Sequence, residues 1–213
     1  PFKQGELIDA TITALARRGG AIAEANGAEV RVLGGVPGDR AELRITHTGK
    51  HINVGQIQTL HTPSPHRVEA PCPVVTTCGG CPWQPASLEL QRERRAEEVA
   101  TLLDPLCDAD TRRHGWIGGD DDTIGYRTRA LMVLRHRGGT IRMGFYAPGT
   151  QELVPAEPCV VQHPLVNAVL KRAHAILKRH DWPTWRGSDR KGVLRGLLYR
   201  VDPEVGEGLL TLV

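Results

Sequence analysis

The chain has 213 residues, of which 40% are hydrophobic and 24% charged, a composition that fits a folded globular protein of one large or two modest domains. Its net charge of +3 permits a polyanionic partner without requiring one, and no apolar run reaches the roughly 18 residues of a membrane span. The first residues, PFKQGELIDA, lack the features of a signal peptide, so we expect a cytoplasmic protein with reduced thiols.

The first sixty residues show the pattern of a small barrel of short strands. Polar and apolar residues alternate over residues 7–15, as they do in a strand with one buried face. Four further strand candidates follow, separated by segments rich in turn-forming glycine, proline and asparagine. Their sequences are GAIAEAN, AEVRVLG, RAELRIT and NVGQIQTL. Because closure of five short strands removes exposed sheet edges, we expect an all-β barrel over residues 1–64.

Residues 65–86 form a proline-rich linker and a loop with three of the five cysteines. Cys72, Cys78 and Cys81 have the spacing C-x5-C-x2-C, and Cys159 comes much later. Structural zinc sites usually use two C-x2-C pairs, whereas three ligands in one loop with a distant fourth suit a 4Fe-4S cluster. The two glycines between the second pair would let the backbone wrap closely around such a cluster. A four-thiolate zinc site and unligated thiols are the alternatives.

Residues 87–122 are predicted to hold one helix and an irregular connection. Ser87 is suited to cap the N-terminus of a helix over 87–103. One face of this helix comprises Leu88, Arg92, Ala96, Val99 and Leu103, and the rest of its surface is rich in Glu and Arg.

An α+β domain with an antiparallel sheet is predicted over residues 123–213, incomplete at its C-terminus. Strand patterns over 126–146 flank the pair Gly138-Gly139, which suits a hairpin turn. One face of the first strand has basic ends and an apolar middle: Arg127, Arg129, Leu131, Val133, Arg135 and Arg137. A helix then begins at Pro164, and its predicted apolar side comprises Leu165, Val169, Ala173, Ile176 and Leu177, with His174 on the polar side. A second hairpin ends the sequence.

Several motifs resemble the RNA uracil-C5 methyltransferase family, and the resemblance extends over essentially the whole chain. CPVVTTCGGCPWQ, LELQ, YRTRA and MGFYAPGTQELVPAEPC are similar to the branch of that family that carries a 4Fe-4S cluster and modifies ribosomal RNA. ARRGGAIA, VLGGVPGD and TPSPHRVEAPC resemble its TRAM domain, an RNA-binding OB-fold. The implied fold class is an all-β OB-fold (TRAM) barrel followed by an α+β domain with an antiparallel sheet and a four-cysteine iron–sulfur site.

The resemblance also implies a function. Family members use a Rossmann-like domain to transfer a methyl group from S-adenosylmethionine to C5 of a uracil. No strand here is followed by a glycine-rich turn and an acidic residue roughly twenty positions on, so we expect that domain, its cofactor site and its catalytic residues to be absent from this chain. The chain would then be the RNA-recognition and iron–sulfur portion of a 23S rRNA uracil-C5 methyltransferase. A stand-alone, non-catalytic RNA-binding iron–sulfur protein and a redox-sensing module are the alternatives.

Four arginines are the candidate RNA contacts. The protein is expected to be a monomer that binds RNA and does not bind a membrane. Arg17 and Arg18 belong to a loop of the barrel, and an OB-fold offers a shallow groove for a single strand. Arg127 and Arg129 match the YR-x-R stretch of the family and are expected to contact RNA near a flipped-out uridine. The alternative is that these arginines only solvate a sheet edge.

Overall fold

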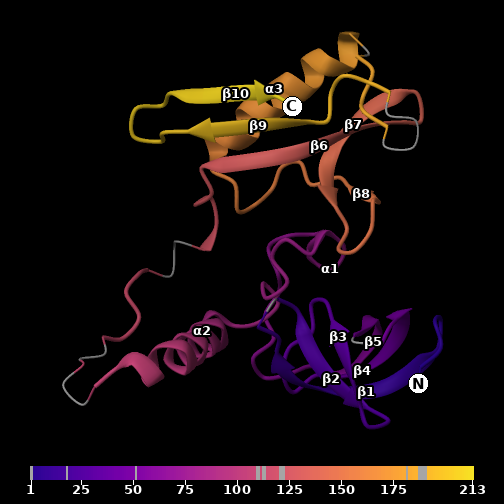
Figure 1. Ribbon diagram of the computed structural model, residues 1–213, viewed down its shortest axis with the longest axis vertical. Coiled ribbons are helices and arrows are strands. Elements are labelled where there is room, and N and C mark those ends of the chain that lie inside the picture. The colour runs from indigo at the N-terminus through magenta and orange to yellow at the C-terminus, as the bar shows by residue number, and fades with distance from the viewer. Residues whose placement is uncertain are drawn as a thin grey trace. The chain divides into compact units, whose positions relative to one another are not determined.

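The computed structural model describes residues 2–17, 19–50, 52–108, 111, 114–119, 123–180, 182–186 and 191–213 (Figure 1). The chain divides into two compact units, residues 1–118 and 119–213. Each unit has its own cluster of buried hydrophobic side chains. Among the described residues, no helix combines the length and the apolar character that crossing a membrane requires.

Unit 1 begins with a closed five-stranded barrel. The strands are β1 (Leu7–Leu15), β2 (Ala21–Ala25), β3 (Ala28–Val32), β4 (Arg40–Thr48) and β5 (Asn53–Thr62). Their order around the barrel is β1-β2-β3-β5-β4, in which only the β3–β5 pair is parallel. The five strands predicted from the sequence are therefore confirmed.

A buried ion pair joins the barrel to the segment that follows it. The Asp39 side chain is inaccessible to solvent and accepts hydrogen bonds from Arg67 Nη2 at 2.5 Å, Val36 N at 2.7 Å and Ser64 N at 2.9 Å. Burial alone would raise the pKa of Asp39, but the hydrogen bonds and charge of these partners outweigh it and hold the pKa below its usual value of 3.8. Asp39 thus holds the segment that follows the barrel, through Ser64 and Arg67, against the barrel itself.

Three helical segments complete the described part of unit 1: α1 (Val75–Cys78), α2 (Leu88–Leu103) and the 3-10 helix η1 (Asp104–Leu106). Ser87 caps α2 as predicted, because its Oγ accepts a hydrogen bond from Leu90 N at 3.3 Å. No residue of α2 is fully buried, and the side chains of Val99 and Leu103 are about half exposed.

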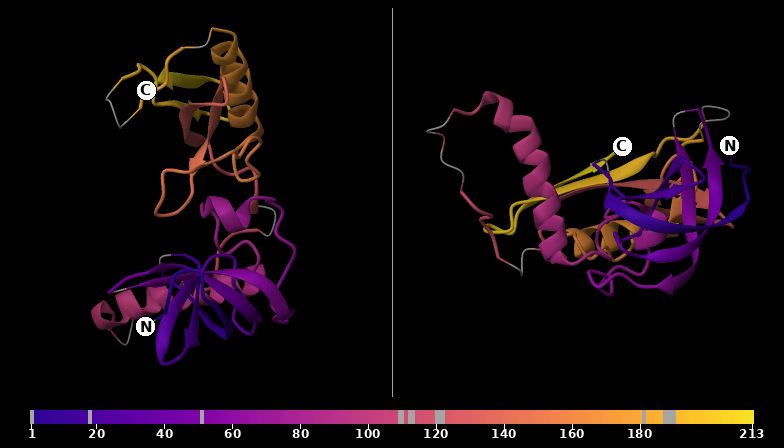
Figure 2. Two further views of the ribbon diagram at one scale, coloured as in Figure 1. Left: turned by 90° about the vertical axis from the view of Figure 1, so that its right-hand side faces the viewer. Right: turned by 90° about the horizontal axis from the view of Figure 1, so that it is seen from below.

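Unit 2 is an antiparallel sheet with a helix on one face (Figure 2). The strands are β6 (Arg129–Arg137), β7 (Thr140–Tyr146), β8 (Leu153–Val154), β9 (Gly196–Val201) and β10 (Gly208–Leu212), in the order β10-β9-β6-β7-β8. Gly138 and Gly139 have φ of +62° and +75°, which confirms the predicted two-residue hairpin turn. The helix α3 (Pro164–His180) covers the face formed by residues such as Met132, Leu134 and Leu197.

The buried side of α3 is rotated from the side predicted. Its buried residues are Val166, Leu170, Ala173, His174 and Leu177, whereas Leu165 and Ile176 are exposed. The His174 ring nitrogens contact Glu157 Oε2 at 2.9 Å and Ile141 O at 3.0 Å, so a polar ring is accommodated among apolar neighbours. Apolar residues lie on both sides of the row of buried residues in α3. The periodicity of the sequence alone therefore did not define which side of the helix faces the sheet.

Candidate functional site

The cysteine loop of unit 1 is built around the short helix α1. Cys72 precedes this helix, Cys78 ends it, and Cys81 follows three residues later. Gly79 caps α1 with φ of +67°, a conformation that favours glycine, and a side chain at Gly80 would approach Cys78 Sγ to 3.5 Å. All three thiols are partly exposed. Gly79 therefore serves the tight exit from α1, whereas the contact at Gly80 is of ordinary van der Waals length.

The cysteine loop is attached to the barrel through a buried tryptophan. Trp83 is 6% exposed, belongs to the barrel core, and donates a hydrogen bond from Nε1 to Gly20 O at 2.8 Å. The Arg95 guanidinium lies 4.2 Å from the centre of the Trp83 ring. A side chain at Gly19 would come within 2.7 Å of Pro82 Cγ. The turn after β1 and the cysteine loop thus fit each other closely.

The fold-class prediction of a formed four-cysteine iron–sulfur site is wrong for the described geometry. Across the described ranges, no three or more His, Cys, Asp and Glu side chains are arranged to hold a metal ion. Cys72, Cys78 and Cys81 lie before, at the end of and after the short helix α1, and Cys159 belongs to the other unit. As a residue assignment, the ligand set of Cys72, Cys78, Cys81 and Cys159 stays a prediction.

Cys159 lies in unit 2, where its backbone is held by one asparagine. Cys159 N donates to Asn167 Oδ1 at 3.0 Å, and Asn167 Nδ2 donates to Cys159 O at 3.0 Å. Asn167 belongs to α3, which packs on the sheet, so the backbone of Cys159 has a fixed position within unit 2. Its thiol is partly exposed.

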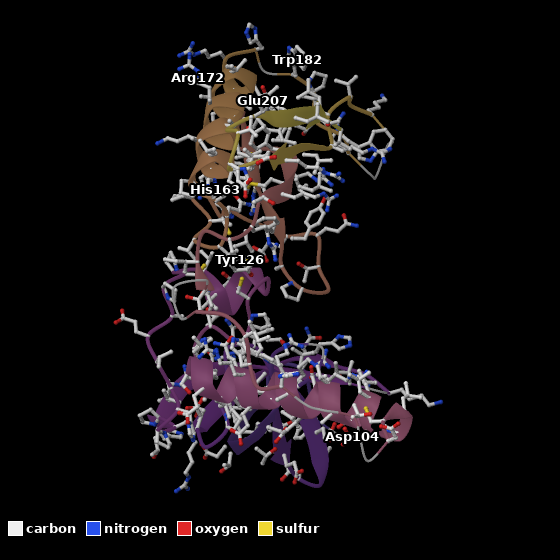
Figure 3. The ribbon with its side chains drawn as sticks, turned by 90° about the vertical axis from the view of Figure 1, so that its left-hand side faces the viewer. Asp104, Tyr126, His163, Arg172, Trp182 and Glu207 are labelled. Atoms are coloured by element: carbon white, nitrogen blue, oxygen red, sulfur yellow. The ribbon has the colours of Figure 1, made fainter. Side chains whose placement is uncertain are left out.

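The predicted RNA-contact arginines belong to different units. Arg17 is an exposed residue of the turn after β1, and Arg18 lies outside the described residues. Arg127 N donates to Val161 O at 2.8 Å, and Arg127 O accepts from His163 N at 2.9 Å, next to Tyr126 (Figure 3). Arg129 is the exposed first residue of β6. The structure thus holds Arg127 and Arg129 together at one end of the sheet in unit 2.

Further arginines on the same sheet were not identified as RNA contacts from the sequence. In the cross-strand register, Arg129 lies directly opposite Arg200 on β9, and Arg135 lies directly opposite Arg142 on β7. These residues face away from α3, because the residues that alternate with them form the core under that helix. The arginine face is defined as this outer surface and its cations, Arg129, Arg135, Arg137, Arg142, Arg195 and Arg200. In the sequences TIRMGFY and GLLYRV, the alternation of residues that face the core with residues that face outward could have identified Arg142 and Arg200 as members of this face.

Comparisons with known proteins point to one class. The chain is 32% identical over 99% of its length to an uncharacterized RNA methyltransferase of Gloeobacter violaceus, and 28% identical over its whole length to one of Bacillus cereus. In both cases the chain spans 46% of the relative, about half its length. No family model matches the chain.

A solved structure has a similar fold. It is the tRNA (uracil-54, C5)-methyltransferase of Pyrococcus abyssi, in complex with S-adenosyl-L-homocysteine, and the TM-score is 0.62 with 18% identity. The match covers 94% of this chain and 44% of that protein. At this identity the similarity is evidence for the fold alone.

These matches contradict the prediction that the methyltransferase domain is absent from this chain. Relatives called RNA methyltransferases match it from end to end, and the methyltransferase structure covers nearly all of it. The prediction rested on the lack of a glycine-rich turn in this sequence, and the lack of one motif does not exclude a methyltransferase domain.

Proposed function

We propose that this chain belongs to an S-adenosylmethionine-dependent RNA methyltransferase that modifies C5 of uracil, and that the chain contributes to RNA binding. The observation that carries the proposal is the end-to-end similarity to RNA methyltransferases. The choice of uracil C5 is supported by the name of the structural neighbour and by motifs such as CPVVTTCGGCPWQ. The proposal includes a ribosomal RNA target, because those motifs resemble the branch of the family that modifies ribosomal RNA.

S-adenosylmethionine would supply the methyl group, but no step of the transfer is assigned to residues of this chain. The contribution argued from this structure is the binding and positioning of RNA.

Methyl transfer tests the proposal directly. Protein that includes this chain is incubated with S-adenosylmethionine labelled in its methyl group and with separated ribosomal and transfer RNA. We expect 5-methyluridine in the ribosomal RNA digest. Label in transfer RNA alone would replace the proposed target while keeping the reaction, and label on another base would contradict uracil-C5 chemistry. Gel filtration of the same preparation tests the predicted monomer.

Metal analysis tests the predicted cysteine ligands. If Cys72, Cys78, Cys81 and Cys159 bind a 4Fe-4S cluster, anaerobically purified protein contains about four iron and four sulfide ions per chain and absorbs visible light. Cys81→Ser should then lose the absorption and weaken RNA binding. Cys107→Ser should keep both, because Cys107 lies outside the spacing pattern. Zinc without sulfide would favour the four-thiolate zinc site. Colourless, metal-free protein would contradict both the iron–sulfur cluster and the zinc site.

A further inference from the structure

The arginine face places like charges directly opposite each other on neighbouring strands. The pairs are Arg129 with Arg200 and Arg135 with Arg142. Residues directly opposite in an antiparallel pair point to the same face, and like charges in these positions destabilise a sheet. Two repulsive pairs on one surface therefore lower the stability of the folded sheet. Anions bound at these pairs would restore that stability.

The arginine face has no acidic side chains of its own. The strands β6, β7, β9 and β10 contain five arginines and no Asp or Glu. Within the described ranges, Arg129, Arg142 and Arg200 are exposed and form no ion pair. The wider sequence agrees, because residues 119–213 carry 14 basic and 10 acidic residues, a net +4, against 13 and 14, a net −1, in residues 1–118.

Aromatic rings orient two cations of the arginine face. The Arg195 guanidinium lies 4.1 Å from the centre of the Trp185 ring, and the Arg135 guanidinium lies 5.3 Å from that of Tyr146 and donates to the Tyr146 hydroxyl. Burial, together with the positive charge of Arg195, lowers the pKa of Arg135. Stacking holds these guanidinium groups in place although they repel each other.

Two aliphatic side chains, the exposed Leu131 and the partly buried Leu198, lie between the two arginine pairs. Leu131 is 47% exposed and stands opposite Leu198 on β9. The six-residue step from Arg129 to Arg135 along β6 spans about 20 Å at roughly 3.3 Å per residue. Cations at both ends of an apolar surface of this length match a single strand of nucleic acid, whose phosphates are charged and whose bases have apolar faces.

We propose that the arginine face binds a single-stranded segment of RNA, with phosphates held by the pairs Arg129–Arg200 and Arg135–Arg142 and bases lying over Leu131 and Leu198. The RNA class of this partner rests on the proposed function. A protein partner fits less well, because it would have to supply a carboxylate for each pair, whereas a nucleic acid supplies regularly spaced phosphates.

The test compares two variants that each remove two positive charges from unit 2. Arg129→Gln with Arg200→Gln changes the arginine face. Lys171→Gln with Arg172→Gln changes exposed residues of α3, the helix on the opposite face of the sheet (Figure 3). Binding of a mixed-sequence single-stranded RNA oligonucleotide to the 213-residue chain is measured by fluorescence anisotropy over a series of salt concentrations.

We expect the Arg129/Arg200 variant to bind RNA roughly tenfold more weakly, with a salt slope smaller by about 1.4, because each phosphate of a single strand that is no longer neutralised lowers the slope by about 0.7. The Lys171/Arg172 variant should bind within about twofold of wild type. The Tm of the Arg129/Arg200 variant should be unchanged or higher, because a like-charge pair is removed. Arg142→Gln repeats the test with a single substitution.

Three results would overturn the proposal. The first is wild-type affinity and salt slope in the Arg129/Arg200 variant, which would refute the arginine face while leaving the proposed function in place. The second is an equal loss in both double variants, which would show a general charge effect, and the third concerns the wild-type chain. Failure of the wild-type chain to bind any RNA would overturn the arginine face together with RNA binding by this chain. Unchanged RNA binding with altered self-association in the Arg129/Arg200 variant would identify a protein contact there instead.

Discussion

At the scale of single residues, the Asp39–Arg67 pair connects the barrel of unit 1 to the linker that precedes the cysteine loop. Asp39 is fully buried and holds two backbone N–H groups in addition to Arg67. Removing one partner of a buried ion pair leaves the other charge without compensation, which costs more than the intact pair contributes. The carboxylate is therefore a structural group, and its effect should be visible in the stability of unit 1.

Asp39→Asn should lower the free energy of unfolding of unit 1 by about 3 kcal/mol, because Arg67 loses its carboxylate partner. Chemical denaturation at neutral pH measures the change. Asp9→Asn is the matched control, since Asp9 is 82% exposed and pairs with His61 at the surface of the same barrel. Its expected cost is below about 0.5 kcal/mol. Equal effects of the two substitutions would contradict the role given to burial.

The Asp39 carboxylate should also make unit 1 sensitive to acid. Its pKa is lower in the folded protein than the usual 3.8, so the stability it provides is complete above pH 3.8 and is lost as the pH falls through the folded pKa. The stability difference between wild type and Asp39→Asn should therefore shrink as the pH is lowered below 3.8. Thermal melts over this range measure it, and a constant difference would contradict the lowered pKa.

At the scale of elements, the short strand β8 depends on a glycine in β7. A side chain at Gly144 would place its Cβ 2.1 Å from Val154 O and 2.8 Å from Val154 C. Backbone atoms cannot move aside as the end of a flexible side chain can, so the two strands would have to separate. The pairing at risk is Phe145 with Val154 and Tyr146 with Leu153.

Gly144→Ala should destabilise unit 2 by about 3 kcal/mol, because the added methyl group is incompatible with the β7–β8 pairing. Hydrogen exchange at the amides of β7 and β8 would report the loss locally. Gly115→Ala serves as the control, since nothing lies within 4 Å of a Cβ at Gly115. Unchanged protection of β8 in the Gly144→Ala variant would show that the pairing tolerates a side chain.

Elements defined by local signals were predicted well from the sequence. Alternation gave the bounds of β1, hydroxyl chemistry gave Ser87 as the cap of α2, and the pair Gly138-Gly139 gave the hairpin turn. Each depends on residues close together in the chain. The rotation of α3 was missed, because it depends on which distant segment the helix packs against.

In the candidate site, too, features set by nearby residues were predictable from the sequence, whereas features set by distant segments were not. Arg129 could be identified from its own strand, but its partner Arg200 is 71 positions away and depends on the β6–β9 register. The cysteine spacing was plain in the sequence, yet the helical turn α1 that separates Cys72 from Cys78 was not. Residue types were thus predictable, whereas their arrangement in space required the register and the loop geometry.

At the scale of the whole molecule, the segment between the units should be the first site of proteolysis. The described residues 107–108, 111, 114–119 and 123–125 include no strand or α-helix. Trp116 is 59% exposed in this segment, whereas Trp83 and Tyr199 are each 6% exposed within folded cores. Cleavage requires backbone that is exposed and free of regular structure, and this segment provides both.

Brief digestion with chymotrypsin should therefore cut after Trp116 before Trp83 or Tyr199, and mass spectrometry of the early fragments identifies the cut. Because each unit has its own buried core, both fragments should resist further cleavage for longer than the intact chain resists the first cut. Trp116→Ala should delay the first cut without changing the later ones. An early cut inside β6 or α3 would show that unit 2 does not form a folded unit of its own.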